Sequence, residues 1–556
     1  MPSAPLDPLV VHRVLGGRPY AEIGRPFLAA RDDRTRVFAA AGYLGGMQWP
    51  GRDASGGRAE HRVGVYTRDG LRHLLRTRYR VQALAFHPEL PLLAIGTGGW
   101  YYEGELLLVD LGSGRVVSVF DGERDVSGLR WLDARTLDVR MATSEDEDLT
   151  EEGPSEVREL LVREDWSRVA GRSVAVDDLP YAPPEFMPLE PPAESAGEVV
   201  RLHAEIEAAG DPRGPVWAVE SLPDGGLLAT HHGAQVERWD PDGTLRWAVA
   251  KAEGGRELLR TPDGSAVWVN GTTRTTWGFS GWEPQPYPVD LIAVRDGAVL
   301  GTVDPGFAVA AVMRTDGWLA LRDCRVHVEN PLTVLVGPDG AEAARAEVGE
   351  YSLFAHHFPV RRSPELLFLR GEGVQGTVDR WVVAVDPPTS GGAATVRRLF
   401  PLDWDPGLGD GVAGGPAVFH TDDAGGRALI HGGGVYRDRK ARSGSGYVVR
   451  RAYPSGEPVW VFGADAAPAA VDADGDTVYV ALGSGEIVAL DAGDGTVRAR
   501  GLLRLDGQIA DPLSLAVVGP GRVVVGTVDG RIAECGFAGP PGGDSCRWAD
   551  TSAIIA

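Results

Sequence analysis

The sequence predicts an all-β protein built from about nine to ten four-stranded units. Two observations carry this prediction. Tight turns of the Asp-Gly type recur between short runs rich in Val, Leu, Tyr and Trp, and the resulting hairpins follow one another in pairs. Asp-Gly between apolar runs favours a hairpin because glycine accepts positive φ at little cost. Two consecutive hairpins give a unit of four strands.

The repeated hairpins cover most of the chain. RWDPDGTLRWAVA at 238–250 shows the pattern clearly, and it follows another predicted hairpin at 216–232. Further examples lie at 64–75, 106–120, 291–303, 333–346, 448–462 and 487–500. The units are irregularly spaced, by roughly 40 to 75 residues, which is typical of β-propeller blades that carry loop insertions.

The number of units leaves the ring arrangement open. About nine units are fairly complete, and a final half unit lies at 516–537. A ring must pair its last blade with its first, because an open edge strand is a liability. The segment 9–17 could supply the missing outer strand. Ten blades in one ring would be uncommon. Either some of these units are not true blades and the chain forms one large ring, or the chain forms two propellers.

Residues 179–214 form the one plausible internal boundary. They include PYAPPEFMPLEPP, which should be extended because proline fixes φ and lacks a donor. A short helix should follow, with Ser195 and Glu198 as its capping box. The predicted organisation is therefore propeller blades at 1–178, a Pro-rich linker with one short helix, and further blades at 215–556. The linker either packs across the ring or docks a partner.

The repeats resemble those of bacterial β-propellers of the WD40 and PQQ-like kinds. Phe-His-Pro at 86–88, before a turn and a strand of small residues, is similar to a WD40 repeat. Glycine followed four residues later by tryptophan is similar to a PQQ-like repeat, at Gly243 and Trp247 and again at Gly456 and Trp460. The usual Gly-His and Trp-Asp pair of WD40 repeats is largely missing. These motifs specify an architecture and not an activity.

Composition narrows the classes of partner. The chain has 556 residues, 43% of them hydrophobic, and a formal net charge of -23. Such a charge argues against a general nucleic-acid binder, which needs a positive surface for phosphates. The N-terminus lacks the pattern of an export signal, and no window reaches the roughly 18 apolar residues of a membrane span. We therefore expect a cytoplasmic protein with no membrane or nucleic-acid partner.

Two pairs of adjacent histidines are candidate metal ligands, at 231–232 and 356–357. Neighbouring residues of a strand point to opposite faces, so both imidazoles of a pair cannot easily reach one metal ion. For His231 and His232 we predict a role in a blade turn.

The acids Asp472, Asp474 and Asp476 resemble a calcium-binding loop. Gly475 comes too early for that pattern, and a blade turn explains the residues without an ion. The run EDEDLTEE at 145–152 is either a disordered acidic insertion or a dock for a basic partner. No phosphate loop, nucleophile elbow or His-Glu-x-x-His motif is present, so we expect no metal and no cofactor.

The large insertions fall repeatedly between the second and third strands of a unit, in the B–C loops. By connectivity, the A–B and C–D turns of a blade emerge at one face and the B–C and D–A loops at the other. Loops expose large apolar groups mainly where they bind something or fold back on themselves. We predict a partner-binding site formed by Trp49, Trp100, Tyr101, Tyr102, Trp277, Phe279, Trp282 and Tyr436. The alternative is that these rings pack over the blades as local lids.

The sequence thus favours a non-enzymatic scaffold that binds a partner protein through its B–C loops. Its overall type looks similar to propeller components that bacteria encode beside MoxR-type AAA ATPases and von Willebrand A proteins in conflict or stress systems. That resemblance implies a partner of one of these two classes. The alternative function is a metal-dependent hydrolase or lyase with a site at the propeller centre.

Overall fold

The structure is a computed structural model that describes most of residues 9–175 and 213–537. Within these ranges the description omits residues 17–20, 24, 33, 45–46, 50–51, 54–59, 99–102, 123, 144–154, 232, 252–253, 272–274, 279–280, 285–286, 308, 324–330, 350–359, 373–377, 390–392, 403–410, 414, 423 and 438–439. The predicted linker helix, the acidic run at 145–152 and the histidines at 356–357 lie outside the described residues.

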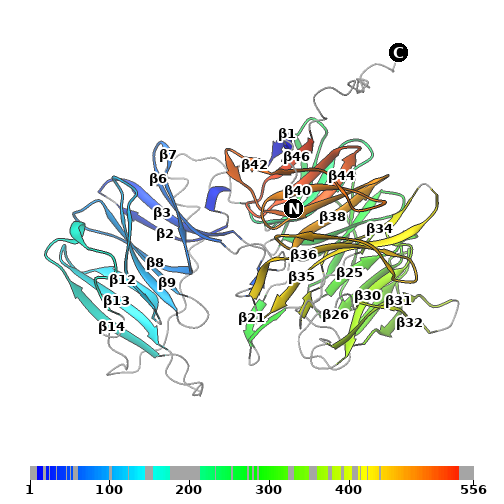
Figure 1. The fold of residues 1–556 in the computed structure, drawn as a ribbon, viewed down its shortest axis with the longest axis horizontal. Helices are drawn as coiled ribbons and strands as arrows, with labels where there is room; N and C mark the ends of the chain where they lie inside the picture. The colour runs from blue at the N-terminus through cyan, green and yellow to red at the C-terminus, as the bar shows by residue number, and fades with distance from the viewer. Residues whose placement is uncertain are drawn as a thin grey trace, which may run out of the picture.

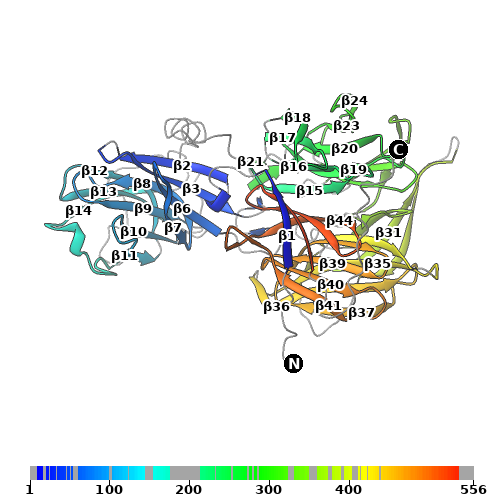
Figure 2. The same ribbon diagram turned by 90° about the horizontal axis from the view of Figure 1, so that it is seen from above.

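The predicted β-propeller architecture is confirmed. The described part of the chain forms ten sheets of three or more strands. Apart from strands, it contains the short 3-10 helices η1 (Ala21–Ile23) and η2 (Trp166–Arg168). The sheets fall into two bodies, seven in one and three in the other, which are separated in both views of the molecule (Figures 1 and 2).

The larger body is called the seven-blade ring, and its blades are numbered in chain order. Blade 1 has β15 (Val216–Ser221), β16 (Leu227–His231), β17 (Gly233–Trp239) and β18 (Leu245–Lys251); blade 2 has β19 (Gly255–Arg260), β20 (Ala266–Gly271), β23 (Val289–Ala293) and β24 (Val299–Val303); blade 3 has β25 (Val309–Met313), β26 (Leu319–Asp323), β27 (Leu332–Val336) and β28 (Glu342–Glu347). Blade 4 has β30 (Leu366–Glu372), β31 (Val378–Asp386) and β32 (Thr395–Pro401); blade 5 has β34 (Ala417–Thr421), β35 (Arg427–Arg437), β36 (Lys440–Ala452) and β37 (Pro458–Ala464), joined by β29 (Val360–Arg361) and β33 (Gly411–Ala413). Blade 6 has β38 (Pro468–Asp474), β39 (Thr477–Leu482), β40 (Glu486–Asp491) and β41 (Val497–Leu502); blade 7 has β44 (Pro512–Gly519), β45 (Arg522–Thr527), β46 (Ile532–Phe537) and β1 (Leu9–Leu15).

The smaller body is called the three-sheet lobe. Its first sheet has β2 (Arg25–Asp32), β3 (Val37–Leu44), β6 (Glu60–Thr67) and β7 (Gly70–Thr77); the second has β8 (Arg80–Phe86), β9 (Leu92–Gly98), β10 (Gly104–Asp110) and β11 (Val116–Gly122); the third has β12 (Asp125–Trp131), β13 (Thr136–Thr143) and β14 (Ser155–Val162). Three small hairpins complete the described strands: β4 (Met47–Trp49) with β5 (Arg52–Asp53), β21 (Thr275–Gly278) with β22 (Gly281–Pro284), and β42 (Arg504–Leu505) with β43 (Gln508–Ile509).

The seven blades close into a ring because each one packs on the next through its own apolar cluster. Separate clusters join blade 1 to 2, 2 to 3, 3 to 4, 4 to 5, 5 to 6 and 6 to 7. A seventh cluster brings Ala516 and Val524 of blade 7 against Val219 and Leu227 of blade 1. The blades thus bury both faces of each sheet, as β-sheets with two apolar faces require.

The N-terminal strand joins the end of the chain. β1 runs antiparallel to β46, with Leu9 opposite Phe537 and Leu15 opposite Ile532. It is therefore the outer strand of blade 7, and it lies beside β46 in Figure 1. The three-sheet lobe follows β1 and precedes β15 in the chain, so the lobe is an insertion between the closing strand of the ring and its first blade.

The three sheets of the lobe form an open stack, and the outer faces of its first and third sheets need no further sheet to cover them. At one end, Ile23 of η1 packs with Phe38 and Tyr66 on the outer face of the first sheet. At the other end, the outer face of the third sheet carries Asp138, which is buried and paired with arginines; the Nε atom of Arg158 lies 2.7 Å from one of its carboxylate oxygens. The apolar outer face of the first sheet is thus covered by η1, and the outer face of the third sheet is polar, as in the terminal units of other stacked repeats.

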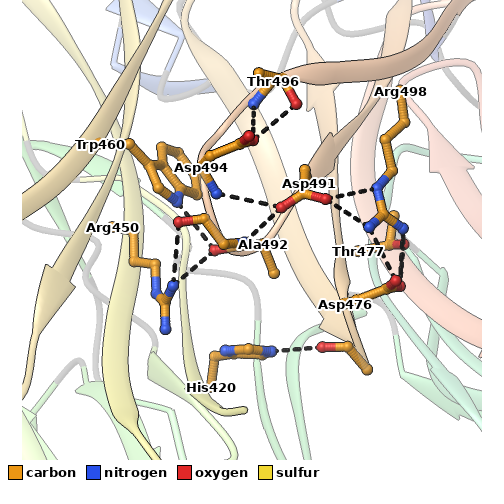
Figure 3. Close-up of polar contacts among 12 residues, drawn as sticks. His420, Arg450, Trp460, Asp476, Thr477, Asp491, Ala492, Asp494, Thr496 and Arg498 are labelled. Atoms are coloured by element: carbon orange, nitrogen blue, oxygen red, sulfur yellow. Dashed lines mark hydrogen bonds and ion pairs between the residues drawn. The ribbon is translucent and has the colours of Figure 1, made fainter. Parts of the chain in front are cut away.

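A repeated contact locks neighbouring blades and explains the Gly-x-x-x-Trp spacing. Trp460 of β37 donates its indole N–H to the carbonyl oxygen of Ala492 in blade 6 over 3.0 Å, and Arg450 donates to the same oxygen over 2.9 Å (Figure 3). In blades 1 and 2, Trp247 and Arg238 likewise donate to the carbonyl of Val294, over 3.2 and 2.8 Å.

Each of these tryptophans lies on a turn glycine of the following blade. A Cβ atom added to Gly495 would lie 2.7 Å from the Trp460 ring, and one added to Gly297 would lie 2.9 Å from the Trp247 ring. A side chain in either turn would therefore separate the blades.

Replacing Gly495 with alanine should lower the free energy of unfolding by more than backbone strain alone would. Its φ is +75°, so any side chain costs about 1–2 kcal/mol there, and the contact with Trp460 should add about 1–3 kcal/mol of overpacking. Gly521→Ala is the matched control, because φ is +72° and nothing lies within 4 Å of the added Cβ. Urea unfolding of both variants measures the difference, and equal losses would contradict the packing described.

Candidate functional site at the ring centre and the B–C face

Three sheets extend their B–C connection with additional strands. The β4–β5 hairpin lies between β3 and β6 of the three-sheet lobe, and the β21–β22 hairpin lies between β20 and β23 of blade 2. In blade 5, β35 and β36 continue beyond their neighbours, and β33 pairs with the extension of β35. The A–B turns of the same sheets are short by comparison.

Four of the predicted partner-binding residues lie in these strands. Trp49 is in β4, opposite Arg52, and Tyr436 is in β35. Trp277 of β21 lies directly opposite Trp282 of β22.

The expectation that these four residues lie in loops is wrong. The segment 271–288 was predicted as a loop, whereas β21 and β22 pair antiparallel within it, from Thr275 opposite Pro284 to Gly278 opposite Gly281. The other predicted residues lie outside the described part: Trp100, Tyr101, Tyr102 and Phe279.

The four described aromatic residues of the predicted site belong to two different bodies of the fold. Trp49 belongs to the three-sheet lobe, whereas Trp277, Trp282 and Tyr436 belong to the seven-blade ring. Within the ring, blades 2 and 5 present their B–C ends on the same face by connectivity, on nearly opposite sides of the axis. The β21 strand lies on the side of the ring that faces the lobe (Figures 1 and 2).

The centre of the ring is crossed by two arginines. β29 precedes β30 and has the place of the innermost strand of blade 4, but it pairs in parallel with β34 of blade 5, with Val360 opposite Ala417. Its Arg361 forms an ion pair with Glu220 of blade 1 and donates to the carbonyl of Leu515 of blade 7 over 2.8 Å. Blades 1 and 4 lie across the ring from each other, so this contact spans the axis.

Asp472 of blade 6 is the buried acceptor of this network. Its carboxylate lies 3.0 Å from Nη2 of Arg362 and 3.8 Å from Nη2 of Arg361, and it accepts the backbone N–H of Val517 over 2.9 Å. The side chain is fully buried. Burial alone would lower the pKa of Arg361, but the carboxylates of Glu220 and Asp472 outweigh burial and raise it. Two positive and two negative side chains thus neutralise one another at the ring centre.

Arg362 has a left-handed backbone conformation, which glycine adopts in the A–B turns of the other six blades. The A–B turns of six blades each contain a glycine with positive φ: Gly225, Gly264, Gly317, Gly425, Gly475 and Gly521. The corresponding turn of blade 4 contains Arg362 with φ of 58°. A left-handed arginine costs about 1–2 kcal/mol, and such strain persists where surrounding contacts hold it. Here the ion pair with Asp472 and a 2.6 Å hydrogen bond to the carbonyl of Ala473 hold it.

A second buried network joins blades 1 and 7. Glu237 binds Arg213 through both carboxylate oxygens and accepts the indole N–H of Trp239 over 2.9 Å. His231 Nε2 lies 3.2 Å from the same carboxylate, and Arg213 donates to the carbonyl of Gly530 in blade 7 over 2.9 Å. Burial would raise the pKa of Glu237, but the hydrogen bonds from His231 and Arg213 outweigh it and lower the pKa to about 2.

The turn predicted for His231 is wrong. His231 is the last residue of β16 and is buried. Its imidazole lies beside the carboxylate of Glu237 and is part of that buried network. His232 lies outside the described residues. Sequence reasoning missed Glu237 and Arg213 because nothing in the local pattern marks a carboxylate that will be buried.

The turn predicted at the calcium-like acids is present, but only Asp476 lies in it, since Asp472 and Asp474 belong to β38. β38 ends at Asp474, and Gly475 has φ of 53° before β39 begins. Asp472 belongs to the ring-centre network, and Asp476 binds Arg498 over 2.9 Å (Figure 3). Hydrogen bonds from Arg498 lower the pKa of Asp476.

In the described part of the chain, no three His, Cys, Asp or Glu residues come together in a way that could hold a metal ion. No helix among the described residues is both long and apolar enough to cross a membrane.

The ring of blades makes this chain a β-propeller protein. No protein-family model matches the sequence, and no curated protein matches it. Among solved structures the chain is similar to the C-terminal WD40 domain of Sif2, with 8% identity, 83% of this chain and 96% of that chain covered, and a TM-score of 0.34.

Proposed function

We propose that the protein is a non-enzymatic scaffold that binds a partner protein on the B–C face of the seven-blade ring. The observation that carries this proposal is the extension of two ring blades on that face by additional strands that contain aromatic residues. Trp277 and Trp282 are in the blade 2 hairpin, and Tyr436 is in the blade 5 extension.

The blade 2 hairpin has the chemistry of a binding element. Trp277 of β21 is directly opposite Trp282 of β22, so the hairpin brings two tryptophans to one register position. Tryptophan and tyrosine are enriched among the residues that dominate binding energy at protein interfaces. An isolated two-stranded hairpin is only marginally stable in water, which favours a partner surface that covers it.

The class of partner rests on the resemblance noted from the sequence. We propose an AAA ATPase of the MoxR type or a von Willebrand A protein as the partner, and a cytoplasmic location for the complex. Genes adjacent to the one for this chain identify the proteins to purify for the test.

Changing Trp277 and Trp282 to alanine should weaken partner binding by about 2 kcal/mol or more for each hot spot, which is roughly 30-fold in Kd. The unfolding temperature should hardly change, because substitutions outside the core usually alter stability by about 0.5 kcal/mol or less. Isothermal titration with the purified neighbouring ATPase and von Willebrand A protein, beside thermal melts, measures both quantities.

Trp49→Ala is the matched control, since that residue lies in the hairpin of the three-sheet lobe. It should leave the affinity unchanged. Unchanged affinity in the Trp277/Trp282 variant, together with a lower melting temperature, would show that the two residues are lids and would reject the proposed binding face.

A further inference from the structure

The outer strand of blade 5 is an open edge. β37 pairs with β36, and no other strand of the described chain pairs with it. It lies at the lower edge of the ring in Figure 2. One face of β37 is occupied within the ring, because Trp460 is buried against blade 6 and Phe462 packs on the same cluster. The other face carries Val459 and Val461, which are 51% and 44% exposed.

This edge lacks the charges that protect the equivalent edges of blades 1 and 6. The residue three positions after the turn glycine is Arg246 in blade 1 and Arg498 in blade 6. Arg246 lies 3.4 Å from Asp240, and Arg498 lies 2.6 Å from Asp491. In blade 5 the same position is Val459, and β37 contains no charged residue. Natural proteins normally blunt an exposed edge strand with charge, because unpaired backbone groups invite a further strand.

We propose that β37 pairs with β37 of a second copy of this chain. In a two-fold antiparallel pair, the same strand faces itself, so any charge would lie near its own copy. The uncharged β37 avoids that repulsion, and exposed Val459 and Val461 supply the β-branched cross-strand contacts that stabilise paired strands. Pairing would join β34 to β37 of both copies into one continuous sheet across two rings.

The other uncharged outer strand of the ring is less suited to this pairing. β24 has five residues against seven in β37, and Gly301 is at its centre. Glycine in a strand has no side chain to pack and weakens the strand. Leu300, the second residue of β24, is nevertheless 60% exposed. A charge placed there tests whether loss of any exposed apolar side chain is enough to affect dimerisation.

Val459→Arg tests the proposal, because blades 1 and 6 already have arginine at the equivalent position. Light scattering coupled to size exclusion, at chain concentrations of roughly 1 to 100 µM, should show a dimer for the unmodified chain and a monomer for Val459→Arg. Leu300→Arg should remain dimeric. Added salt should strengthen the dimer, because each copy carries a net charge of -23 and screening reduces their repulsion.

Val461→Lys is a second variant in case Val459→Arg does not fold. Hydrogen exchange of the β37 amides, compared at low and high concentration of the unmodified chain, gives a measurement without substitution. Slower exchange at high concentration is expected. A monomer at 100 µM, a dimer that both β37 variants retain, or a dimer lost in Leu300→Arg would each overturn the proposal.

Discussion

Glu237→Gln is expected to cost about 3–5 kcal/mol of stability, which is typical of removing one partner from a buried ion pair. The glutamine keeps the volume of the side chain but leaves Arg213 without its counter-charge between blades 1 and 7. Urea unfolding at neutral pH measures the loss. The control is Glu342→Gln, whose exposed pair with Arg345 should contribute less than about 1 kcal/mol. Similar losses in the two variants would contradict the role assigned to Glu237.

The effect of Glu237 should depend on pH in a defined direction. Its pKa is about 2 in the folded protein and 4.5 as the ordinary value, so the carboxylate stabilises the fold fully above the ordinary value. That contribution should fall as the pH drops from about 4.5 toward 2. The stability difference between the unmodified chain and Glu237→Gln should therefore shrink over that acidic window.

Asp472→Asn should be the most damaging change at the ring centre, with a loss of about 3 kcal/mol. The amide no longer neutralises Arg361 and Arg362, and the left-handed backbone of Arg362 loses the ion pair that holds it. Asp476→Asn is the control in the neighbouring turn, because the side chain is largely exposed and its pair with Arg498 should contribute little. Thermal and urea unfolding compare the two variants.

A double variant separates charge from backbone strain. Arg362→Gly would give blade 4 the glycine that the other six A–B turns have at this conformation. In the Asp472→Asn background it should recover part of the lost stability, since it removes both the unpaired guanidinium and the strain. Strictly additive losses for the two substitutions would show that Arg362 and Asp472 do not act together.

The all-β class and the unit of two hairpins could be predicted from the sequence because turn chemistry is local. Gly243, Gly456 and Gly475 all have positive φ, as the Asp-Gly and Ser-Gly turns indicated. The Gly-x-x-x-Trp spacing also reports a real contact, in which Trp460 reaches the next blade. The segment 9–17 was a good candidate for the closing strand because the final half unit at 516–537 lacked an outer strand and an open edge is a liability.

The candidate site could be predicted only in part. Sequence patterns identified aromatic residues in the B–C segments, but they did not show that Trp277 and Trp282 are paired across two strands of a hairpin. They gave no sign of the ring-centre network, whose Arg361 and Glu220 are 141 residues apart in the chain. Those side chains meet because blades far apart in sequence converge on one axis.

The sequence by itself determined the strands, their turns and the repeated four-stranded unit, since each depends on residues a few positions apart. Only the tertiary structure decided that seven blades close into a ring while three sheets form an inserted lobe. The physical reason is that closure depends on how whole sheets pack. β1 must reach β46 across more than five hundred residues, and the polar cap around Asp138 ends the lobe where another blade could have followed.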